Sequence, residues 1–200
     1  DVIAVVDARH PGVTHSDDWD GFGQRTTGSG TSVYVDVPLP AEHLIPFETR
    51  FKYQTAFYQL VLLAVLAGIG RAIERDVTQE IRERKRVFSH GTADTTRGDA
   101  QIQQVVGQIS AQVYAAEAAT LRCAGPLQRA YVARFGHDQE LERQANIDAE
   151  IETAKAQVVV SELILRAATD LFNALGASGV SVSKSLDRHW RNARTAASHN

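Results

Sequence analysis

The chain has 200 residues, of which 44% are hydrophobic and 22% charged, a composition typical of a globular protein rather than a disordered tail or a fibre. Its formal net charge is -3. Because proteins that bind phosphate backbones concentrate an excess of Lys and Arg on one face, we expect no nucleic-acid partner. The single cysteine, Cys123, excludes an internal disulfide and favours a reducing, cytoplasmic compartment.

The first residues lack the basic, apolar and small-residue order of a signal peptide. The most apolar run, residues 60–69, is about half of the roughly 20 residues that a helix needs to cross a bilayer, so we expect it in the core and expect no membrane attachment. The chain contains no methionine, and Asp1 leads directly into an apolar run. We therefore expect the sequence to be an internal part of a longer protein.

Residues 1–46 are predicted to form β structure. The run VIAVV from Val2 is a candidate for a short buried strand, and residues 19–31 are rich in turn formers. Residues 32–37 then alternate, with three valines on one face, until Pro38 and Pro40 end the strand. This segment is too small to stand alone, so it predicts the end of a larger β domain.

From about Glu48 the apolar spacing changes to the 3.6-residue period of a helix. One long helix is predicted to run to about Arg86, because a basic run suits a helix C-terminus. Its expected buried stripe consists of Phe57, Val61, Ala64, Val65, Gly68, Ala72, Ile73, Val77 and Ile81.

Three further helices are predicted after a polar loop. Asp99 is the expected N-cap of a helix over residues 100–135, which Gly125 and Pro126 are expected to kink or split. Another helix is expected over residues 138–175, and the last one after Ser185 as its N-cap. The expected stripe of the second helix is Ile102, Val105, Val106, Ile109, Val113 and Ala116, and that of the third includes Leu141, Ala145, Ile151, Val158, Ala168 and Leu175.

The predicted fold class is therefore mostly α. Helices joined by polar loops are typical of an antiparallel four-helix bundle. We divide the chain into residues 1–46, the end of a middle β domain, and residues 47–200, a C-terminal bundle domain.

Four short motifs occur in a characteristic order: GQRTTGSG at residues 23–30, Arg86 with Phe88, LGASG at residues 175–179, and RNAR at residues 191–194. In this order and at this spacing, over essentially the whole chain, they resemble the second half of the acyl-CoA dehydrogenase superfamily. The resemblance implies that residues 1–46 are the tail of a β-barrel or β-sandwich domain, followed by the family's four-helix bundle.

The final stretch, HWRNARTAASHN, is most similar to the reduced-flavin-dependent monooxygenase branch, which includes dibenzothiophene monooxygenase. Counted from Arg191, His199 and Asn200 fall where the dehydrogenases carry Tyr and a catalytic Glu. An amide has no basic lone pair with which to abstract a carbon-bound proton, whereas a histidine can donate a hydrogen bond or a proton near neutral pH. From position alone, His199 could instead be a partly buried structural histidine.

The resemblance implies an enzyme that uses reduced FMN from a separate flavin reductase, together with O2, to oxygenate an organosulfur or aromatic small molecule. Its catalytic candidates are His199 and Asn200. An FAD-dependent acyl-CoA dehydrogenase is the alternative activity. A non-catalytic helical assembly module that kept the fold and lost the flavin is a third possibility.

The resemblance also implies cofactor-binding residues and a homotetramer. In the family, the arginine matching Arg86 reaches a flavin phosphate or pyrophosphate, often from a neighbouring subunit, and Phe88 accompanies it. The loop of Gly176, Ala177, Ser178 and Gly179 lies near the flavin, and its small residues would let backbone N–H groups approach a phosphate. A solvated charge run and a plain interhelical turn are the structural alternatives for these two motifs.

The remaining histidines and arginines suggest no further site. His10, His15, His43, His90 and His137 show no ligand pairing, so no metal site is predicted. Arg191 and Arg194 are expected to be structural, holding the last helix to the bundle by ion pairs.

Overall fold

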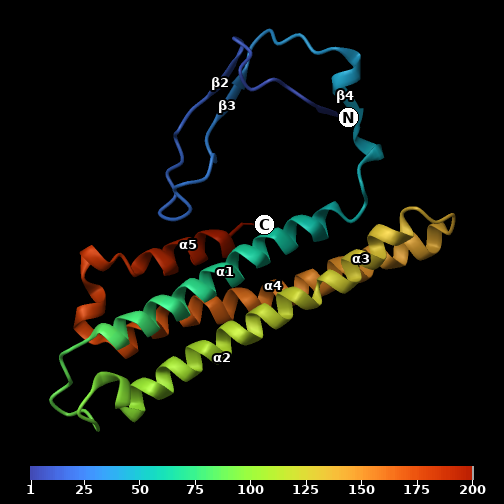
Figure 1. The fold of residues 1–200 in the computed structure, drawn as a ribbon. Coiled ribbons are helices and arrows are strands. Elements are labelled where there is room, and N and C mark those ends of the chain that lie inside the picture. Colours follow the sequence, from blue (N-terminus) through green and yellow to red (C-terminus); the bar gives the residue numbers. More distant parts are fainter. Residues whose placement is uncertain (200) are drawn as a thin grey trace.

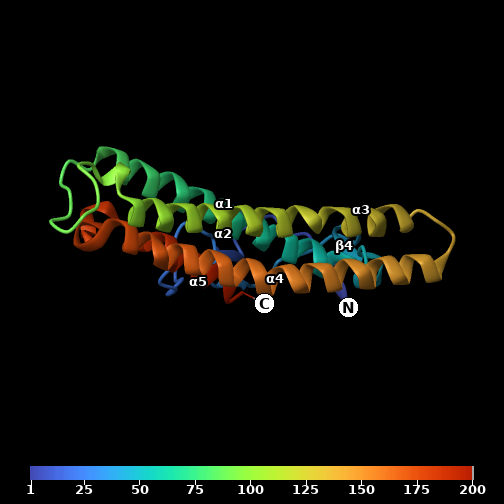
Figure 2. The same cartoon turned by 90° about the horizontal axis from the view of Figure 1, so that it is seen from below.

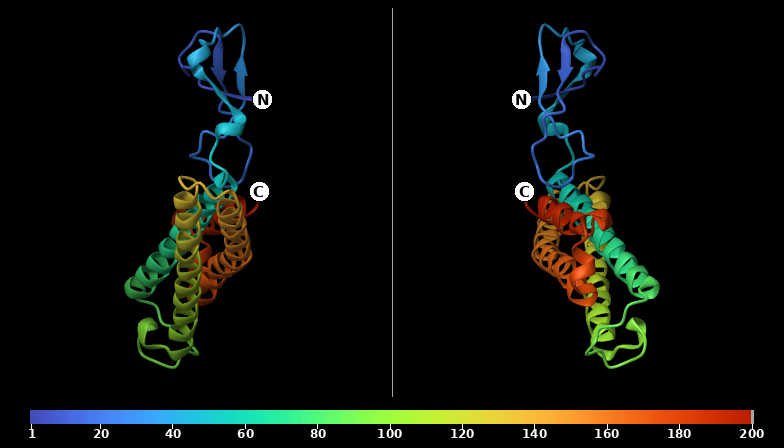
Figure 3. Two further views of the ribbon diagram at one scale, coloured as in Figure 1. Left: turned by 90° about the vertical axis from the view of Figure 1, so that its right-hand side faces the viewer. Right: turned by 90° about the vertical axis from the view of Figure 1, so that its left-hand side faces the viewer.

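The computed structural model describes residues 1–199, which are mostly helical with little sheet (Figure 1). The helices in this range are α1 (Gln54–Glu83), α2 (Ala100–Arg122), α3 (Ala124–Ala133), α4 (Gln139–Leu175) and α5 (Asp187–Ala197). The strands are β1 (Val2–Ala4), β2 (Val13–His15), β3 (Ser32–Tyr34) and β4 (Leu44–Pro46). The strand-bearing segment lies beyond one side of the helices (Figure 3).

The strands form two small antiparallel pairs. Strand β1 pairs with β4, placing Val2 opposite Pro46, and β2 pairs with β3, placing Val13 opposite Tyr34. The predicted buried strand at Val2 is wrong in its burial, because that side chain is exposed. Strand β3 is also shorter than predicted: Asp36 takes a left-handed φ of 49°, which breaks the extended conformation soon after Tyr34.

Helices α1, α2 and α4 pack along one another and enclose the core, with α5 covering α1 and α4 (Figure 1). The view in Figure 2 shows the chain turning back at each end of these long helices. Gly70 permits the contact between α1 and α4, because a Cβ atom there would lie 2.6 Å from Ile164 Cδ1. The largest fully buried apolar residues are Leu63, Leu66, Ile73, Val77, Ile109, Val113, Val160, Ile164, Leu171 and Leu175.

Two predicted helix starts are confirmed. Asp99 Oδ1 accepts hydrogen bonds from the backbone N–H groups of Gln101 and Ile102 at the start of α2. Asp138 caps α4 in the same way. The expected split near Gly125 and Pro126 is also present, since α2 ends at Arg122 and the two residues lie in the first turn of α3, where proline is tolerated.

Other predicted helix ends are wrong. Helix α1 begins at Gln54, after a short 3₁₀ turn at Phe47–Thr49, and ends at Glu83, so Arg86 lies beyond the helix. Ser185 is not the N-cap of α5: its φ is 49° and its hydroxyl donates to the carbonyl of Val182, whereas α5 begins at Asp187 without a side-chain cap. The reason is that the preceding 3₁₀ turn, Val182–Lys184, engages Ser185 first.

The buried stripe was predicted correctly for most of α2, and only in part for α1, where Ile73, Val77 and Ile81 are buried, and for α4. Phe57, Val61 and Val65 are exposed by 42%, 49% and 39%, and Leu141, Ile151 and Val158 on α4 are also exposed. In line with this outer apolar face, α1 is long and apolar enough, by length and composition, to cross a membrane, a test that core helices of soluble proteins also pass. Only 33% of the most apolar 18-residue stretch of α1 is buried.

Candidate functional site

A pocket lies where α1 and α4 both end. It has a volume of about 600 Å³ and is lined by residues 83–89 and Glu80, by Leu175, Ala177 and Ser178, and by Lys184. We call it the cationic pocket. It brings together two of the predicted cofactor-binding motifs, since Arg86 and Phe88 line one side and Ala177 and Ser178 another.

Arg84 joins the two sides of the cationic pocket across 91 residues of sequence. Its Nη1 atom donates to the carbonyl oxygen of Leu175 at 2.6 Å, and its Nε donates to the carbonyl of Arg86 at 3.0 Å. The guanidinium also lies 4.2 Å from the centre of the Phe88 ring, a cation–π distance. Sequence analysis missed Arg84, because it stands in a basic run that looked solvated.

The Gly176–Gly179 segment, a 3₁₀ turn with Val180, supplies the small side of the site. Gly176 has a φ of +58°, and a Cβ atom there would lie 3.2 Å from the Phe88 ring, so glycine allows the ring to lie against the turn. Ser178 donates its hydroxyl to the carbonyl of Leu175 at 3.1 Å. Gly179 is buried against Leu175, which makes its role in the turn one of packing.

The pocket carries more positive than negative charge. Its lining includes four cations, Arg84, Lys85, Arg86 and Lys184, and two carboxylates, Glu80 and Glu83. Glu80 pairs with Lys184. The side chain of Arg86 is exposed and forms no ion pair within residues 1–199, while its carbonyl is held by Thr96 Oγ1 at 3.1 Å. A free guanidinium beside other cations is suited to a phosphate.

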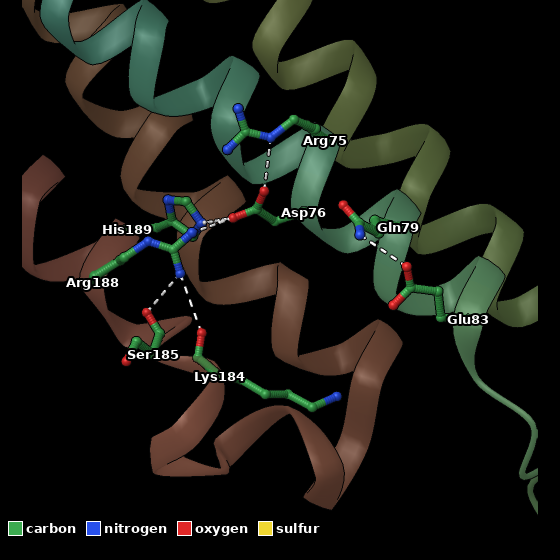
Figure 4. Close-up of polar contacts among 8 residues, drawn as sticks. All are labelled: Arg75, Asp76, Gln79, Glu83, Lys184, Ser185, Arg188 and His189. Atoms are coloured by element: carbon green, nitrogen blue, oxygen red, sulfur yellow. Dashed lines mark hydrogen bonds and ion pairs between the residues drawn. The ribbon is translucent and has the colours of Figure 1, made fainter.

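A partly buried charged cluster fastens the start of α5 to α1 (Figure 4). Asp76 Oδ2 contacts His189 Nε2 at 2.9 Å and also pairs with Arg188, while Oδ1 accepts from Arg75 at 2.9 Å. Arg188 further donates to the carbonyls of Lys184 and Ser185. Sequence analysis did not find this cluster, because its partners lie more than a hundred residues apart.

The surroundings shift both titratable groups of the cluster. Burial lowers the pKa of His189, the charge of Arg188 adds to this effect, and the contact with Asp76 opposes it. Burial alone would raise the pKa of Asp76, but hydrogen bonds from Arg75 and His189 outweigh it and hold the pKa below its usual range. Among residues 1–199, no group of three or more His, Cys, Asp or Glu side chains is placed to hold a metal ion.

The predicted catalytic residues lie elsewhere. His199 follows the end of α5, is exposed, and donates its backbone N–H to the carbonyl of Ala196 at 3.3 Å. Asn200 lies outside the described residues. The end of α5 lies beside the first half of α1, whereas the cationic pocket is at the other end of that helix (Figure 1). The single chain therefore does not bring His199 together with the cofactor-binding candidates.

The motif at residues 23–30 meets the motif at residues 191–194. Arg191 donates through Nη1 to the carbonyl of Phe22 at 3.2 Å and pairs through Nε with Asp187 on its own helix. The expectation that Arg191 binds the bundle by an ion pair is therefore wrong, since it connects α5 to the loop between β2 and β3.

The fold belongs to a known class. The family model described as acyl-CoA dehydrogenase, C-terminal domain, matches residues 60–200, and the chain belongs to this family. Within it, the chain is 24% identical to a dibenzothiophene monooxygenase of Mycolicibacterium goodii over 99% of this chain and 49% of the relative. It is 25% identical to the probable FMNH2-dependent monooxygenase SfnC of Pseudomonas putida, over 99% and 50%.

Solved structures give the same picture of the fold. The methanesulfinate monooxygenase MsuC from Pseudomonas fluorescens superposes with a TM-score of 0.88 at 26% identity, covering 99% of this chain and 51% of that one. The FMN-bound TdsC from Paenibacillus sp. A11-2 superposes with a TM-score of 0.84 at 24% identity, covering 100% and 51%. The chain spans about half the length of the relatives that it matches. These findings confirm the resemblance that the motifs indicated.

Proposed function

We propose that this chain is part of a two-component monooxygenase that uses reduced FMN and O2 to oxygenate an organosulfur or aromatic small molecule. The observation that carries the proposal is the cationic pocket, where Arg86, Phe88 and the Gly176–Gly179 turn meet in a chain related to a probable FMNH2-dependent monooxygenase and to a methanesulfinate monooxygenase. A separate flavin reductase would supply the reduced FMN, which provides the electrons for the reaction.

The pocket residues fit the phosphate end of a flavin. Among residues 1–199 the guanidinium of Arg86 forms no ion pair, so it can form two parallel charge-assisted hydrogen bonds to a phosphate. Phe88, held by Arg84, gives this side of the pocket an apolar surface. Ala177 and Ser178 leave room for a bulky anion beside the turn. In this proposal, Arg84 orients the segment and Arg86 binds the phosphate.

His199 and Asn200 are proposed to act at the reacting end. A histidine can hold or donate a proton near neutral pH, and an exposed position at the end of α5 leaves its ring free for a ligand. Asn200 stands where a dehydrogenase would need a carboxylate base, and an amide cannot serve as one. This favours oxygenation over the alternative, an FAD-dependent acyl-CoA dehydrogenase, which the family membership keeps open.

We further propose the whole-protein context that the sequence indicated. Residues 1–46 would be the end of a β-barrel or β-sandwich domain, and residues 47–200 an antiparallel four-helix bundle. The protein would be a cytoplasmic homotetramer in which one subunit supplies Arg86 and another supplies His199 to the same site. The separation of the two groups within one chain and the exposed apolar residues of α1 support this arrangement.

One experiment separates the two activities. The protein is supplied with NADH, a flavin reductase, FMN, O2 and a panel of organosulfur and aromatic compounds, and oxygenated products are measured by mass spectrometry. In parallel, the oxidised flavoprotein is mixed anaerobically with acyl-CoA thioesters while flavin absorbance is recorded. Product that depends on the reductase supports the proposal. Rapid bleaching by a thioester, without oxygenation, would replace it with the dehydrogenase.

A further inference from the structure

The loop at Phe22–Gln24 is bound to α5 by contacts that span 168 residues of sequence. The backbone N–H of Gln24 donates to Asn192 Oδ1 at 2.7 Å, and the Gln24 side-chain amide donates to the Asn192 carbonyl at 3.3 Å. Gln24 has a φ of 54°, a left-handed conformation that is uncommon for a residue other than glycine. Asn192 therefore accepts hydrogen bonds from both the backbone N–H and the side-chain amide of Gln24, a residue in an uncommon backbone conformation.

Steric fit makes the same contact specific. A Cβ atom on Gly23 would lie 2.2 Å from the carbonyl oxygen of Arg191 and 2.5 Å from Thr195 Oγ1, so only glycine allows the loop to come this close to α5. The rings of Phe22 and Trp190 stack beside this contact, 6.0 Å apart at 18°. We call these contacts between Phe22–Gln24 and residues 190–195 the α5 clamp.

The position of the clamp along the helix gives it a consequence for the site. Asn192 lies about two helical turns before His199, and the loop it holds connects β2 to β3. The clamp therefore holds the middle of α5, from Trp190 to Thr195, against the strand-bearing segment, and His199 follows four residues after Thr195. The opposite end of α5 is fixed separately, by the Asp76 cluster against α1.

We propose that Asn192 is a positioning residue, which through the α5 clamp holds His199 at a fixed place relative to the strand-bearing segment. This rests on the proposed function, in which His199 acts on the reacting groups. Proton transfer and hydrogen bonding to a reacting group require a defined geometry, and a misplacement of about 1 Å can cost about 100-fold in rate.

The first test measures the contact itself. Hydrogen exchange of the backbone amide of Gln24 is followed by mass spectrometry or NMR. The proteins compared are the wild type, Asn192→Ala, Asn192→Asp and Gly23→Ala. Asn192→Ala and Gly23→Ala should speed exchange about 5- to 30-fold, as the loss of one hydrogen bond predicts. Asn192→Asp keeps an oxygen acceptor and should restore protection. Asn173→Ala, which removes an exposed asparagine of α4, is the matched control and should change nothing.

The second test measures the consequence for chemistry. With reduced FMN supplied by a reductase, the share of reduced flavin that ends as hydrogen peroxide is compared with oxygenated product. Asn192→Ala and Gly23→Ala should lower product about 10- to 100-fold and raise peroxide towards the level of His199→Ala. Flavin affinity should stay unchanged in all of them, and Asn192→Asp should recover most of the coupling.

The outcomes separate the positioning role from the proposed function. An unchanged exchange rate of the Gln24 amide in Asn192→Ala would overturn the α5 clamp, and with it the positioning role of Asn192, but would leave the proposed function standing. Faster exchange with full coupling, while His199→Ala is uncoupled, would show that the clamp does not position His199 and would overturn the proposal. Full coupling in His199→Ala would overturn the role of His199 in the proposed function, and with it the reason for positioning that residue.

Discussion

The two ends of α5 are held in different ways. At its start, Asp76, Arg188 and His189 form a charged cluster in which the histidine is only 4% exposed. From its middle onward, towards the end that carries His199, Asn192 holds a loop through neutral hydrogen bonds at a partly exposed surface. Removing Asp76 leaves the buried His189 without its hydrogen-bond partner, whereas a hydrogen bond at a partly exposed surface contributes little net stability. The start of α5 should therefore determine stability, and its end should determine the chemistry.

The largest expected effect is at the far end. If the protein is an oxygenase, His199→Ala should lower the rate of product formation by ~100- to 10,000-fold, because a positioned acid–base group contributes that much. Flavin binding and melting temperature should stay nearly unchanged, since His199 is exposed. Product analysis, flavin fluorescence titration and thermal unfolding check the three parts. A large loss of thermal stability in His199→Ala would contradict the expectation that the end of α5 affects the chemistry and not the stability.

The next effect concerns the start of the helix. Asp76→Ala should lower the free energy of unfolding by about 1–3 kcal/mol, because it leaves the buried His189 without its hydrogen-bond partner. Urea unfolding measures the change. Glu140→Gln, which removes an exposed carboxylate paired with Arg143, is the control and should change stability by less than about 0.5 kcal/mol. Equal effects of the two variants would contradict a special role for the cluster.

Arg86 in the cationic pocket gives a third position, outside α5, at which the effects of a substitution on function and on stability can be compared. Arg86→Ala should weaken flavin binding by about 10- to 100-fold, which corresponds to the ~1.5–3 kcal/mol of a hydrogen bond to a charged group. Its stability should not change, because the side chain is exposed. Fluorescence titration measures the affinity, with Arg134→Ala at the exposed end of α3 as the control. Equal flavin affinity in Arg86→Ala and Arg134→Ala would mean that Arg86 is only a solvated charge.

The smallest expected effect is the pH dependence of the cluster. Burial lowers the pKa of His189 in the folded chain. As the pH falls below about 6.5, this histidine is therefore protonated in the unfolded chain before it is protonated in the folded chain. Stability should therefore be greatest above that pH and fall by up to about 1 kcal/mol towards pH 5.5. Asp76 adds a loss only at much lower pH, since its own pKa lies below the usual range. Urea unfolding of His189→Gln should lack the first decrease, and an identical pH profile would exclude His189 as its source.

Sequence reasoning found the helices more readily than the faces that they bury. The stripe of α2 was predicted largely correctly, because Ile102, Ile109 and Val113 lie on the buried face. On α4, large residues occupy several faces, and the buried one is formed largely by small side chains that apolar periodicity undervalues. Those that were not predicted are Ala149, Ala156, Ala167 and Ala174, whereas the buried Ala145 and Ala168 belonged to the predicted stripe.

The candidate site was predictable only in part. The motifs placed Arg86, Phe88 and Ser178 near one ligand, and they do line one pocket, but the resemblance and not their spacing indicated this. Arg84 was not predicted, because its role depends on the carbonyl at the end of α4. The Asp76–His189 pair and the Gln24–Asn192 pair join positions that no local pattern relates.

The small residues between α1 and α4 also set a ceiling on side-chain volume. A Cβ atom on Gly70 would crowd Ile164 Cδ1, the alanines of α4 are buried, and extra methylene groups in a close-packed interior cost about 1–3 kcal/mol through displaced neighbours. Size therefore restricts substitution at these positions more strongly than hydrophobicity does. A mutational scan of the bundle should tolerate exchanges among its large aliphatic residues and reject most enlargements along this seam.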